Sequence, residues 1–250
     1  MKALNMRQKK IIALLKDYET LTVSEISHII EASDATIRRD LIILAEQHLI
    51  EKFHGGAKSI ESKGYNYIEQ HNKLNQLAYY AASFVEDGDV IFINSSLTAI
   101  LTLNHIVGKQ ITVVTNNPVV VNLNIDKNIE LILLGGMIMP AKKSIVGHFA
   151  TDMLATITAN RCFLGVSALN TTAGLGTTIF QETTINKMFL DRCSGDKIVI
   201  AESHKFGKEG NFISAQLTDI THIVTDTNCS EYDEVAFTAT GVKLIKVKVN

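Results

Sequence analysis

The sequence contains no tryptophan, and aromatic residues of all kinds make up only 6% of its 250 positions. We therefore expect a core of Ile, Leu, Val and Ala, and the 46% of hydrophobic residues argues against wholesale disorder. No fixed-period repeat or low-complexity tract is present. The length suits one large domain, or a small domain joined to a larger one.

Cysteine and long apolar runs are also scarce. Cys162, Cys193 and Cys229 are far apart and odd in number, and no pair has the spacing of zinc ligands. We therefore expect reduced, structural thiols and no metal site. The first residues lack the apolar stretch of a signal peptide, and no run is long enough to span a bilayer. These features predict a cytoplasmic protein without a membrane partner.

Basic residues give no overall excess. The formal net charge is −2, which argues against binding nucleic acid over the whole surface. Residues 1–60 hold nine basic and eight acidic side chains, an excess of a single positive charge. A local DNA-binding face remains compatible with this balance.

Apolar residues at helical spacing predict three short helices in the first sixty residues, the first from about Met6 to Lys16. Thr22 can cap the second helix, with Glu25 completing a capping box. Ser33 can cap the third helix, where Asp34 in the first turn suits the helix dipole. The predicted inward side chains are Ile11, Leu14, Leu15 and Tyr18 in the first helix, Val23, Ile26, Ile29 and Ile30 in the second, and Ile37, Leu41 and Leu44 in the third.

The third helix carries a different set of side chains on its outward side. At about 100° per residue, Arg39 points nearly opposite the inward stripe. Ala35 shares that side, and Thr36 and Arg38 flank it. A small residue, a hydroxyl and two guanidinium groups near a helix N-terminus suit insertion into a DNA major groove. Periodicity and charge alone leave open that the arginine pair simply forms a solvated face.

A wing is predicted after this helix. The segment Leu49–Gly56 is typical of a short strand pair that ends in a glycine turn. Lys52, His54 and Lys58 could reach backbone phosphates from this segment.

Short Ile- and Val-rich runs alternate with helical stretches from about Asp89 onward, which predicts a parallel or mixed sheet covered by helices. These runs are Val90–Ile93, Ile111–Val114, Ile129–Leu134, Arg161–Val166, Lys197–Ile200 and His222–Val224. A polar stretch before them leads into a helix near Lys73–Phe84. We therefore predict a small domain at 1–58, a linker at 59–72 and an α/β domain at 73–250.

Polar or glycine-rich segments follow three of these runs, namely Asn94–Thr98, Thr115–Pro118 and Gly135–Gly136. In open α/β sheets, ligands bind at the carboxyl ends of the strands, where hydroxyl and free backbone N–H groups can hold a phosphate. Turns also favour Ser, Asn and Gly for steric reasons alone, so each segment taken singly leaves an ordinary turn open.

The joint pattern of the N-terminal segment is more specific than its periodicity. Ser33-Asp34-Ala35-Thr36-Ile37-Arg38-Arg39-Asp40-Leu41, followed by Leu49-Ile50-Glu51-Lys52-Phe53-His54-Gly55-Gly56-Ala57, resembles the DeoR family of bacterial repressors. The resemblance implies a winged helix-turn-helix with the third helix on DNA and residues 52–57 as the wing. Asp40 would orient a neighbouring arginine or stabilise the fold. The expected DNA-binding residues are Ser33, Ala35, Thr36, Arg38, Arg39, Lys52, His54 and Lys58.

Two positions depart from that pattern. His48 stands where the family usually has Gly, and Lys52 stands where it usually has Arg. Lys keeps the charge but loses the bidentate fork, so the wing contact is expected to be weaker. Ile42 and Ile43 fall outside the inward stripe, and they could pack under the wing or at a partner surface.

The C-terminal part resembles the effector domain of DeoR-type regulators, which is related to ribose-5-phosphate isomerase and glucosamine-6-phosphate deaminase. The matching pieces are Thr115-Asn116-Asn117, Leu134-Gly135-Gly136, Ser144-Ile145-Val146-Gly147, Phe163-Leu164-Gly165, residues 182–187 and Lys205-Phe206-Gly207. The resemblance implies a sugar phosphate or related metabolite as effector. The expected effector-binding residues are Ser95, Ser96, Thr98, Asn116, Gly135, Gly136, Lys187 and Lys205.

This part departs more sharply from its family. The phosphate loop usually reads Asp-Ser-Gly-Thr-Thr, but here it is Asn94-Ser95-Ser96-Leu97-Thr98. Ser96 replaces a glycine that permits close backbone approach, and Leu97 removes a hydroxyl. Glu202 stands where the family usually has Asp. We therefore expect an effector site that survives with altered specificity.

These observations predict a DNA-binding transcriptional regulator, a repressor by family norm, that binds double-stranded operator DNA as a homo-oligomer and needs no cofactor. A sugar-phosphate isomerase or deaminase is the main alternative, because the α/β part alone could carry acid–base groups. The reading helix would then be unexplained, and no nucleophile–base arrangement is recognisable, so we expect no catalytic residues. An RNA-binding or protein-binding winged helix is the second alternative.

Overall fold

The computed structural model describes residues 4–18, 20–47, 49–53, 55–59 and 72–249. The chain divides into two compact units, Met1–His71 and Asn72–Asn250, and each is described here by itself. The predicted linker at 59–72 falls almost wholly outside the described residues, as do His48 and His54. No helix in the described part of the chain is long and apolar enough to cross a membrane.

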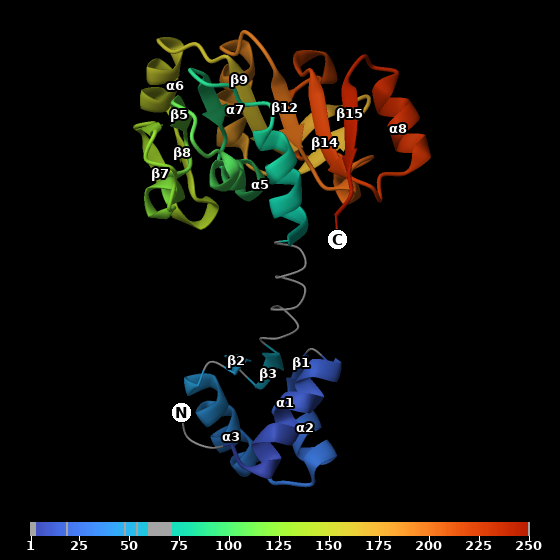
Figure 1. Ribbon diagram of the computed structural model, residues 1–250. Helices are drawn as coiled ribbons and strands as arrows, with labels where there is room; N and C mark the ends of the chain where they lie inside the picture. Colours follow the sequence, from blue (N-terminus) through green and yellow to red (C-terminus); the bar gives the residue numbers. More distant parts are fainter. Residues whose placement is uncertain (1–3, 19, 48, 54, 60–71, 250) are drawn as a thin grey trace. The chain divides into compact units, whose positions relative to one another are not determined.

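The N-terminal unit is a winged helix-turn-helix. Its helices are α1 (Met6–Tyr18), α2 (Val23–Ile30) and α3 (Asp34–Glu46), and its strands are β1 (Thr20–Thr22), β2 (Ile50–Phe53) and β3 (Gly56–Ser59). The strands form an antiparallel sheet in the order β1-β3-β2. The three predicted helices and the strand pair of the wing are thereby confirmed (Figure 1).

The predicted inward stripes form the core of this unit, with one correction. Ile11, Ile26, Ile37, Leu41 and Leu44 are completely buried together with Leu15. Ile29, however, is 46% exposed, while Ile30 is partly buried against the core. Ile30 lies close to the line through Val23 and Ile26, whereas Ile29 is turned by about 90° from it. The side chain of Tyr18 lies outside the described part.

The glycine turn of the wing lies between its two strands rather than after them. Gly55 forms the turn with φ +96°, a left-handed conformation that favours glycine. Gly56 is already the first residue of β3, and a Cβ there would lie 2.5 Å from the carbonyl oxygen of Leu21. The wing strand can therefore approach β1 closely only because this residue has no side chain.

The C-terminal unit is built on a parallel sheet of seven strands in the order β15-β14-β12-β9-β4-β5-β6. The strands are β4 (Val90–Ile93), β5 (Ile111–Thr115), β6 (Ile129–Leu133), β9 (Arg161–Gly165), β12 (Lys197–Ile200), β14 (His222–Asp226) and β15 (Lys243–Val247). The six predicted runs all form strands of this sheet. Strand β15 completes the sheet without having been predicted.

Two smaller antiparallel sheets stand beside the large one. One joins β10 (Ala168–Asn170), β11 (Gly174–Thr177) and β13 (Phe212–Ala215), and the other is the hairpin of β7 (Met137–Met139) and β8 (Ser144–Val146). The α-helices are a helix at 72–82, α5 (Leu97–Ile100), α6 (His148–Ala155), α7 (Phe180–Asp191) and α8 (Glu231–Thr238). The 3-10 helices are η1 (Leu101–His105), η2 (Pro118–Asn122), η3 (Pro140–Lys142), η4 (Ser203–Lys205) and η5 (Leu217–Asp219).

The large sheet has an apolar layer on each face, because successive side chains of a strand point to opposite sides. Phe92 of β4 joins one buried cluster with residues of α6, α7 and α8. Its neighbours Ile91 and Ile93 join a second cluster with residues of the helix at 72–82 and of α5. Helices therefore cover both faces of the sheet (Figure 1).

The strand order reverses its direction beside β4. From β4 the chain proceeds outward through β5 to β6, and it then returns to build β9, β12, β14 and β15 on the other side. Such a reversal creates a crevice at the carboxyl ends of the two strands that flank it. Here the reversal falls between β4 and β9, and we use the word crevice for the carboxyl ends of these two strands, where Asn94–Thr98 and Gly165 are found.

Candidate functional site

The start of α3 is fixed by a side-chain cap. Ser33 has an extended backbone, and its hydroxyl oxygen accepts a hydrogen bond from Thr36 N at 3.3 Å. The hydroxyl groups of Ser33 and Thr36 are 2.9 Å apart. In the preceding turn, Glu31 adopts a left-handed conformation and Ala32 N donates to Ser27 O at 3.1 Å. The turn therefore presents the first residues of α3 as an ordered surface.

The outward side of α3 carries the predicted recognition residues. Ala35, Arg38 and Arg39 are exposed, and Thr36 is partly exposed. Neither arginine forms an ion pair with another residue in the described part of the chain. Two unpaired guanidinium forks beside a small residue are free to donate to phosphates or guanine edges. Ile42 and Ile43, 43% and 36% exposed, extend this surface toward the end of the helix.

Asp40 faces the interior of the unit instead. Its side chain is almost completely buried, and it accepts hydrogen bonds from Arg7 Nε and from Gln8 Nε2, the latter at 3.0 Å. The bond to the Asp40 carboxylate raises the pKa of Arg7. Asp40 thus anchors α1 to α3, as expected for a residue that stabilises the fold. The arginine that Asp40 orients is therefore Arg7 of α1, not a neighbouring arginine on α3.

The described wing offers one free and one paired lysine. Lys52 is exposed on β2. Lys58 lies opposite Glu51 in the β2–β3 register, and the two side chains form an ion pair at 2.9 Å. A phosphate contact by Lys58 would therefore compete with Glu51, whereas Lys52 forms no ion pair with another described residue of the wing. The predicted contact of His54 lies outside the described residues.

In the C-terminal unit, Asn94 joins β4 to β9 at the crevice. Its Oδ1 accepts from Gly165 N at 3.0 Å and from Ser96 N at 3.3 Å. Its Nδ2 donates to Gly165 O at 2.9 Å and to Asn186 Oδ1 at 3.1 Å. The side chain is 3% exposed. Every donor of the amide is therefore used by the protein, and Asn94 shapes the loop rather than presenting a free group.

The hydroxyl groups of the next two residues point toward neighbouring elements. Ser95 Oγ donates to Glu182 Oε1 of α7 at 2.9 Å, and Thr177 Oγ1 donates to the other carboxylate oxygen at 3.4 Å. Ser96 covers Gly165 so closely that a Cβ on that glycine would lie 1.8 Å from Ser96 Oγ. The serine that replaces the usual loop glycine is thus accommodated by a glycine on the opposite strand. Thr98 is buried at 4% exposure.

Strands β5 and β6 supply further polar groups at the same edge of the sheet. Asn117 Nδ2 donates to Ser95 O at 3.1 Å. Asn116 Nδ2 donates to Ser144 Oγ and to Ile145 O, both at 3.1 Å, while its buried Oδ1 has no hydrogen-bond partner among the described residues. Gly135 and Gly136 follow β6 and are exposed. Asn116 therefore offers an unused acceptor near the predicted site.

The two predicted lysines occupy different surroundings. Lys205 Nζ donates to Val166 O, just beyond β9, at 2.7 Å. Burial lowers the pKa of Lys205, and the nearby carboxylate of Glu202 partly opposes this effect. Lys187 instead pairs with Asp191 at 3.0 Å and with Asp219, just before β14, at 3.2 Å. The structure thus brings Lys205 to the carboxyl edge of the sheet and directs Lys187 toward the amino end of β14.

Three residues of this region had no role in the sequence-based prediction. Glu182 and Asn186 are buried on α7, four residues apart and hence on one helical face, and both contact the end of β4. Thr177 at the end of β11 contacts Glu182. The spacing of Glu182 and Asn186 on one otherwise buried helix face is the signal that could have identified them.

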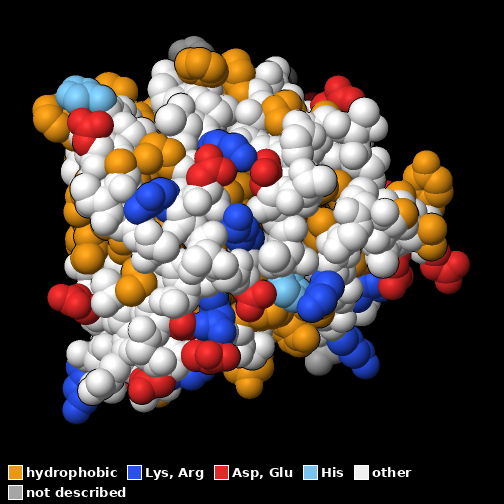
Figure 2. All heavy atoms as spheres, turned by 90° about the horizontal axis from the view of Figure 1, so that it is seen from above, with side chains coloured by type: hydrophobic (Ala, Val, Ile, Leu, Met, Phe, Trp, Pro, Cys, Tyr) orange, Lys and Arg blue, Asp and Glu red, His pale blue; other side chains and the backbone are white. Residues whose placement is uncertain are grey.

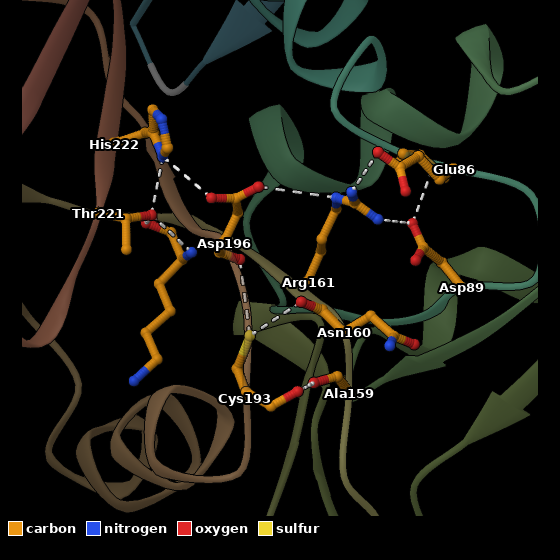
Figure 3. A network of polar contacts seen from close by, with 12 residues as sticks. Glu86, Asp89, Ala159, Asn160, Arg161, Cys193, Asp196, Thr221 and His222 are labelled. Atoms are coloured by element: carbon orange, nitrogen blue, oxygen red, sulfur yellow. Dashed lines mark hydrogen bonds and ion pairs between the residues drawn. The ribbon is translucent and has the colours of Figure 1, made fainter.

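A separate polar network lies at the amino ends of the strands (Figure 3). Arg161 at the start of β9 pairs with Asp89, with Glu86 at 2.9 Å and with Asp196 at 3.8 Å. Asp196 also lies 3.6 Å from His222 Nδ1 at the start of β14. Because it ties adjacent strands together at the edge opposite the crevice, this network supports the sheet and is not part of the candidate site. No cluster of metal-ligating side chains occurs in the part of the chain that the structure describes.

An exposed reading helix in one unit and a polar crevice at a strand reversal in the other define a class of protein, the DNA-binding regulators that carry a sensor domain. Residues 7–63 match the DeoR-like helix-turn-helix domain, and residues 69–227 match the DeoR C terminal sensor domain. The chain therefore belongs to the DeoR family of transcriptional regulators.

Relatives match over almost the whole chain. An uncharacterized HTH-type transcriptional regulator of Bacillus subtilis (strain 168), YulB, is 30% identical over 248 residues, which is 96% of this chain and 95% of that protein. A lactose phosphotransferase system repressor of Staphylococcus aureus is 29% identical over 230 residues, covering 88% and 91%. Ribose 5-phosphate isomerase A from Neisseria gonorrhoeae matches with a TM-score of 0.38 and 14% identity, over 54% of this chain and 53% of that one.

Proposed function

We propose that this regulator is a repressor that binds operator DNA through α3 and the wing and responds to a phosphorylated sugar or related metabolite. The observation that carries the proposal is that one unit exposes two guanidinium groups on α3 and the other holds polar side chains together at the ends of β4 and β9. A repressor needs both a DNA contact and a site whose occupancy alters it.

The chemistry of the crevice supports an anionic, hydroxyl-bearing ligand. The backbone N–H groups at the start of α5 can donate to phosphate oxygens, and Lys205 supplies a cation at the same edge of the sheet. Ser95 can donate to a phosphate in place of its present bond to Glu182. The carboxylate of Glu182, already bonded to Ser95 and Thr177, can accept from sugar hydroxyls. One relative is named as a repressor of a lactose phosphotransferase system, which agrees with a phosphorylated sugar as the signal.

The effector is tested by calorimetric titration of the full chain against a panel of sugar phosphates, with inorganic phosphate and the matching free sugars as comparison ligands. We expect saturable binding of one sugar phosphate, and weaker binding of it by Lys205→Met. The exposed Lys208 provides a matched control, because Lys208→Met removes the same charge outside the crevice. Saturable binding of no member of the panel would rule out the sugar-phosphate assignment.

The operator is found by selecting the fragments of the source genome that the protein binds. The genes beside the bound fragments would then indicate the pathway and narrow the panel of effectors. Addition of the effector should release the selected fragment if the protein is a repressor of the inducible kind. Tighter DNA binding in its presence would instead indicate a co-repressor.

We infer that the chain acts without catalysis, in the cytoplasm where its operator lies, and as a homo-oligomer. Its relatives are regulators, and paired reading helices match spaced half-sites on DNA. The enzymatic alternative is tested by incubating the full chain with the sugar phosphates and following isomerisation or ammonia release. Robust turnover would favour the isomerase or deaminase function.

A further inference from the structure

One side of the C-terminal unit exposes large apolar side chains on adjoining elements. Met137 and Ile138 of β7 are 57% and 56% exposed, and Phe149 of α6 is 66% exposed. A groove of about 500 Å³ lies beside Met137 and Phe149, lined by Gly136, Met137, Val146, Gly147, His148 and Phe149. Ile138 follows Met137 in β7 and points to the other side of the strand, so it does not line the groove. We call the surface formed by Met137, His148 and Phe149 the β7–α6 face. Figure 2 shows hydrophobic side chains gathered along the side on which Figure 1 places β7, β8 and α6.

This face is held in place by the structure beneath it. Ile145 and Val146 of β8 pair with Ile138 and Met137 and are buried in the core. Strand β8 is bonded to the end of β5, since Ile145 N donates to Asn116 O at 2.8 Å. Strand β7 pairs only with β8 in the described sheets, so its outer edge is open. An exposed apolar edge strand on a firm support is a feature that proteins normally cover.

Charged side chains of opposite sign flank the apolar centre. Lys142 and Lys143 lie at the tip of the β7–β8 hairpin, and Asp152 lies one turn beyond Phe149 on α6. All three are exposed, and none forms an ion pair with another described residue. The face thus has an apolar centre with free cations at one end and a free anion at the other. A second copy related by a two-fold axis would place its anion opposite these cations, so the face is complementary to itself.

We propose that two copies of this chain associate through the β7–α6 face. Met137 and Phe149 of both copies form the centre of the contact, and Lys142 and Lys143 of one copy face Asp152 of the other. The proposal deepens the proposed function, on which it rests, because an operator-binding regulator needs paired reading helices. It also places the contact next to Asn116, so that the dimer interface and the effector site share one strand end.

The apolar centre is tested by sedimentation velocity on the full chain over a wide range of concentrations. We expect the wild-type protein to dimerise, and Met137→Glu or Phe149→Glu to raise the dimer dissociation constant by about 100-fold or more, since each buries an unpaired charge at the centre of an interface. Val235 on α8 is 70% exposed, and Val235→Glu serves as the matched control that should leave dimerisation unchanged. A wild-type monomer, or a dimer that both Met137→Glu and Phe149→Glu leave intact, would overturn the proposal.

The flanking charges are tested by exchange. Reversing both lysines (Lys142→Glu with Lys143→Glu) should weaken the dimer about tenfold, and Asp152→Lys should weaken it similarly, because each change opposes like charges. Combining all three substitutions should restore most of the affinity. Each variant alters an exposed side chain, so folding is expected to be retained, and circular dichroism verifies this. Failure of the combined variant to recover affinity would contradict the proposed two-fold arrangement.

The same variants separate this inference from the proposed function. Phe149→Glu protein is titrated with the sugar-phosphate panel alongside the wild type. If no sugar phosphate binds while dimerisation follows the β7–α6 face, the effector assignment is wrong and the interface stands. If a sugar phosphate binds while the dimer dissociation constant is unchanged by these substitutions, the effector assignment stands and this interface is wrong.

Discussion

The functional side chains of the two units differ in what they contact. In the N-terminal unit, Arg38 and Arg39 are exposed and lack ion-pair partners among the described residues. The apolar core of this unit and the buried Asp40 beneath them do not involve either arginine. In the sensor unit, Asn94, Glu182 and Asn186 are buried and bonded to one another's elements. The DNA-reading surface can therefore be altered without disturbing its fold, whereas the crevice and the fold of the sensor unit depend on the same hydrogen bonds.

The largest effect is expected from removing the two guanidinium groups of α3 together. Each such contact with a base or phosphate is worth about 1–3 kcal/mol, so Arg38→Ala combined with Arg39→Ala should weaken operator binding at least about 30-fold and flatten its salt dependence. Fluorescence anisotropy on the selected fragment at several salt concentrations measures both. Lys127→Ala combined with Lys208→Ala removes the same charge from exposed sites of the sensor unit and should change little. Equal affinity of the two double variants would remove the arginines from the interface.

A core substitution in the reading unit should separate the stabilities of the two units. Leu41 is completely buried, so Leu41→Ala should destabilise the N-terminal unit by about 2–5 kcal/mol. Its neighbour Ile42 is 43% exposed, and Ile42→Ala should have an effect below about 1 kcal/mol. Amide hydrogen exchange followed by mass spectrometry measures the protection of each unit separately, because each peptide comes from only one unit. Equal loss of protection in sensor peptides would show that the units unfold together.

In the sensor unit, a nearly isosteric change should destabilise both crevice and fold. Asn94→Asp places a carboxylate oxygen against Gly165 O where the amide now donates at 2.9 Å, which should destabilise the unit by about 1–3 kcal/mol. Because the protonated carboxyl can donate, its folded-state pKa is raised, and the loss should diminish as the pH falls. Thermal unfolding at several pH values tests this, with the exposed Asn104→Asp as control. Equal stability of the two variants would remove the amide from its assigned role.

The smallest effect concerns the protonation of Lys205. Burial lowers the pKa of this lysine, and a phosphorylated ligand pairs only with the ammonium form. Affinity for that ligand should therefore fall as the pH rises through the lowered pKa, below the usual range for lysine. Lys205→Met should lose about tenfold in affinity and most of this pH dependence. Calorimetry across the alkaline range measures it, and an unchanged slope in the variant would place the titrating group elsewhere.

Local features of the sequence predicted the reading unit well. The capping box of Thr22 and Glu25 and the cap by Ser33 are both present. These predictions are confirmed because a helix cap and a helical stripe depend on interactions between residues at most four positions apart. Ile29 is the exception, because it is turned by about 90° from the line through Val23 and Ile26, whereas Ile30 lies close to that line and packs against the core.

The sensor unit was predicted less completely because its pairings join distant segments. Six strands were recognised from composition, but β15 has lysines at every second or third position and only partly buried side chains. Such a pattern is typical of an edge strand, and it lacks the continuous apolar run of a central parallel strand. Strands β10 and β11 form a local hairpin, but the pairing of β11 with β13 joins distant residues such as Leu175 and Ala215, which no local pattern specifies.

The sequence by itself determined the helices, their caps, the outward direction of Arg38 and Arg39 and the family to which the chain belongs, because these depend on neighbours within one or two turns. Only the tertiary structure decided that β9 lies beside β4, so that Asn94 meets Gly165 across 71 positions. It also decided that Lys187 turns to Asp219 while Lys205 reaches the crevice. Strand order is fixed by packing between segments far apart in the chain, and this order brings the residues of the candidate effector site to one edge of the sheet.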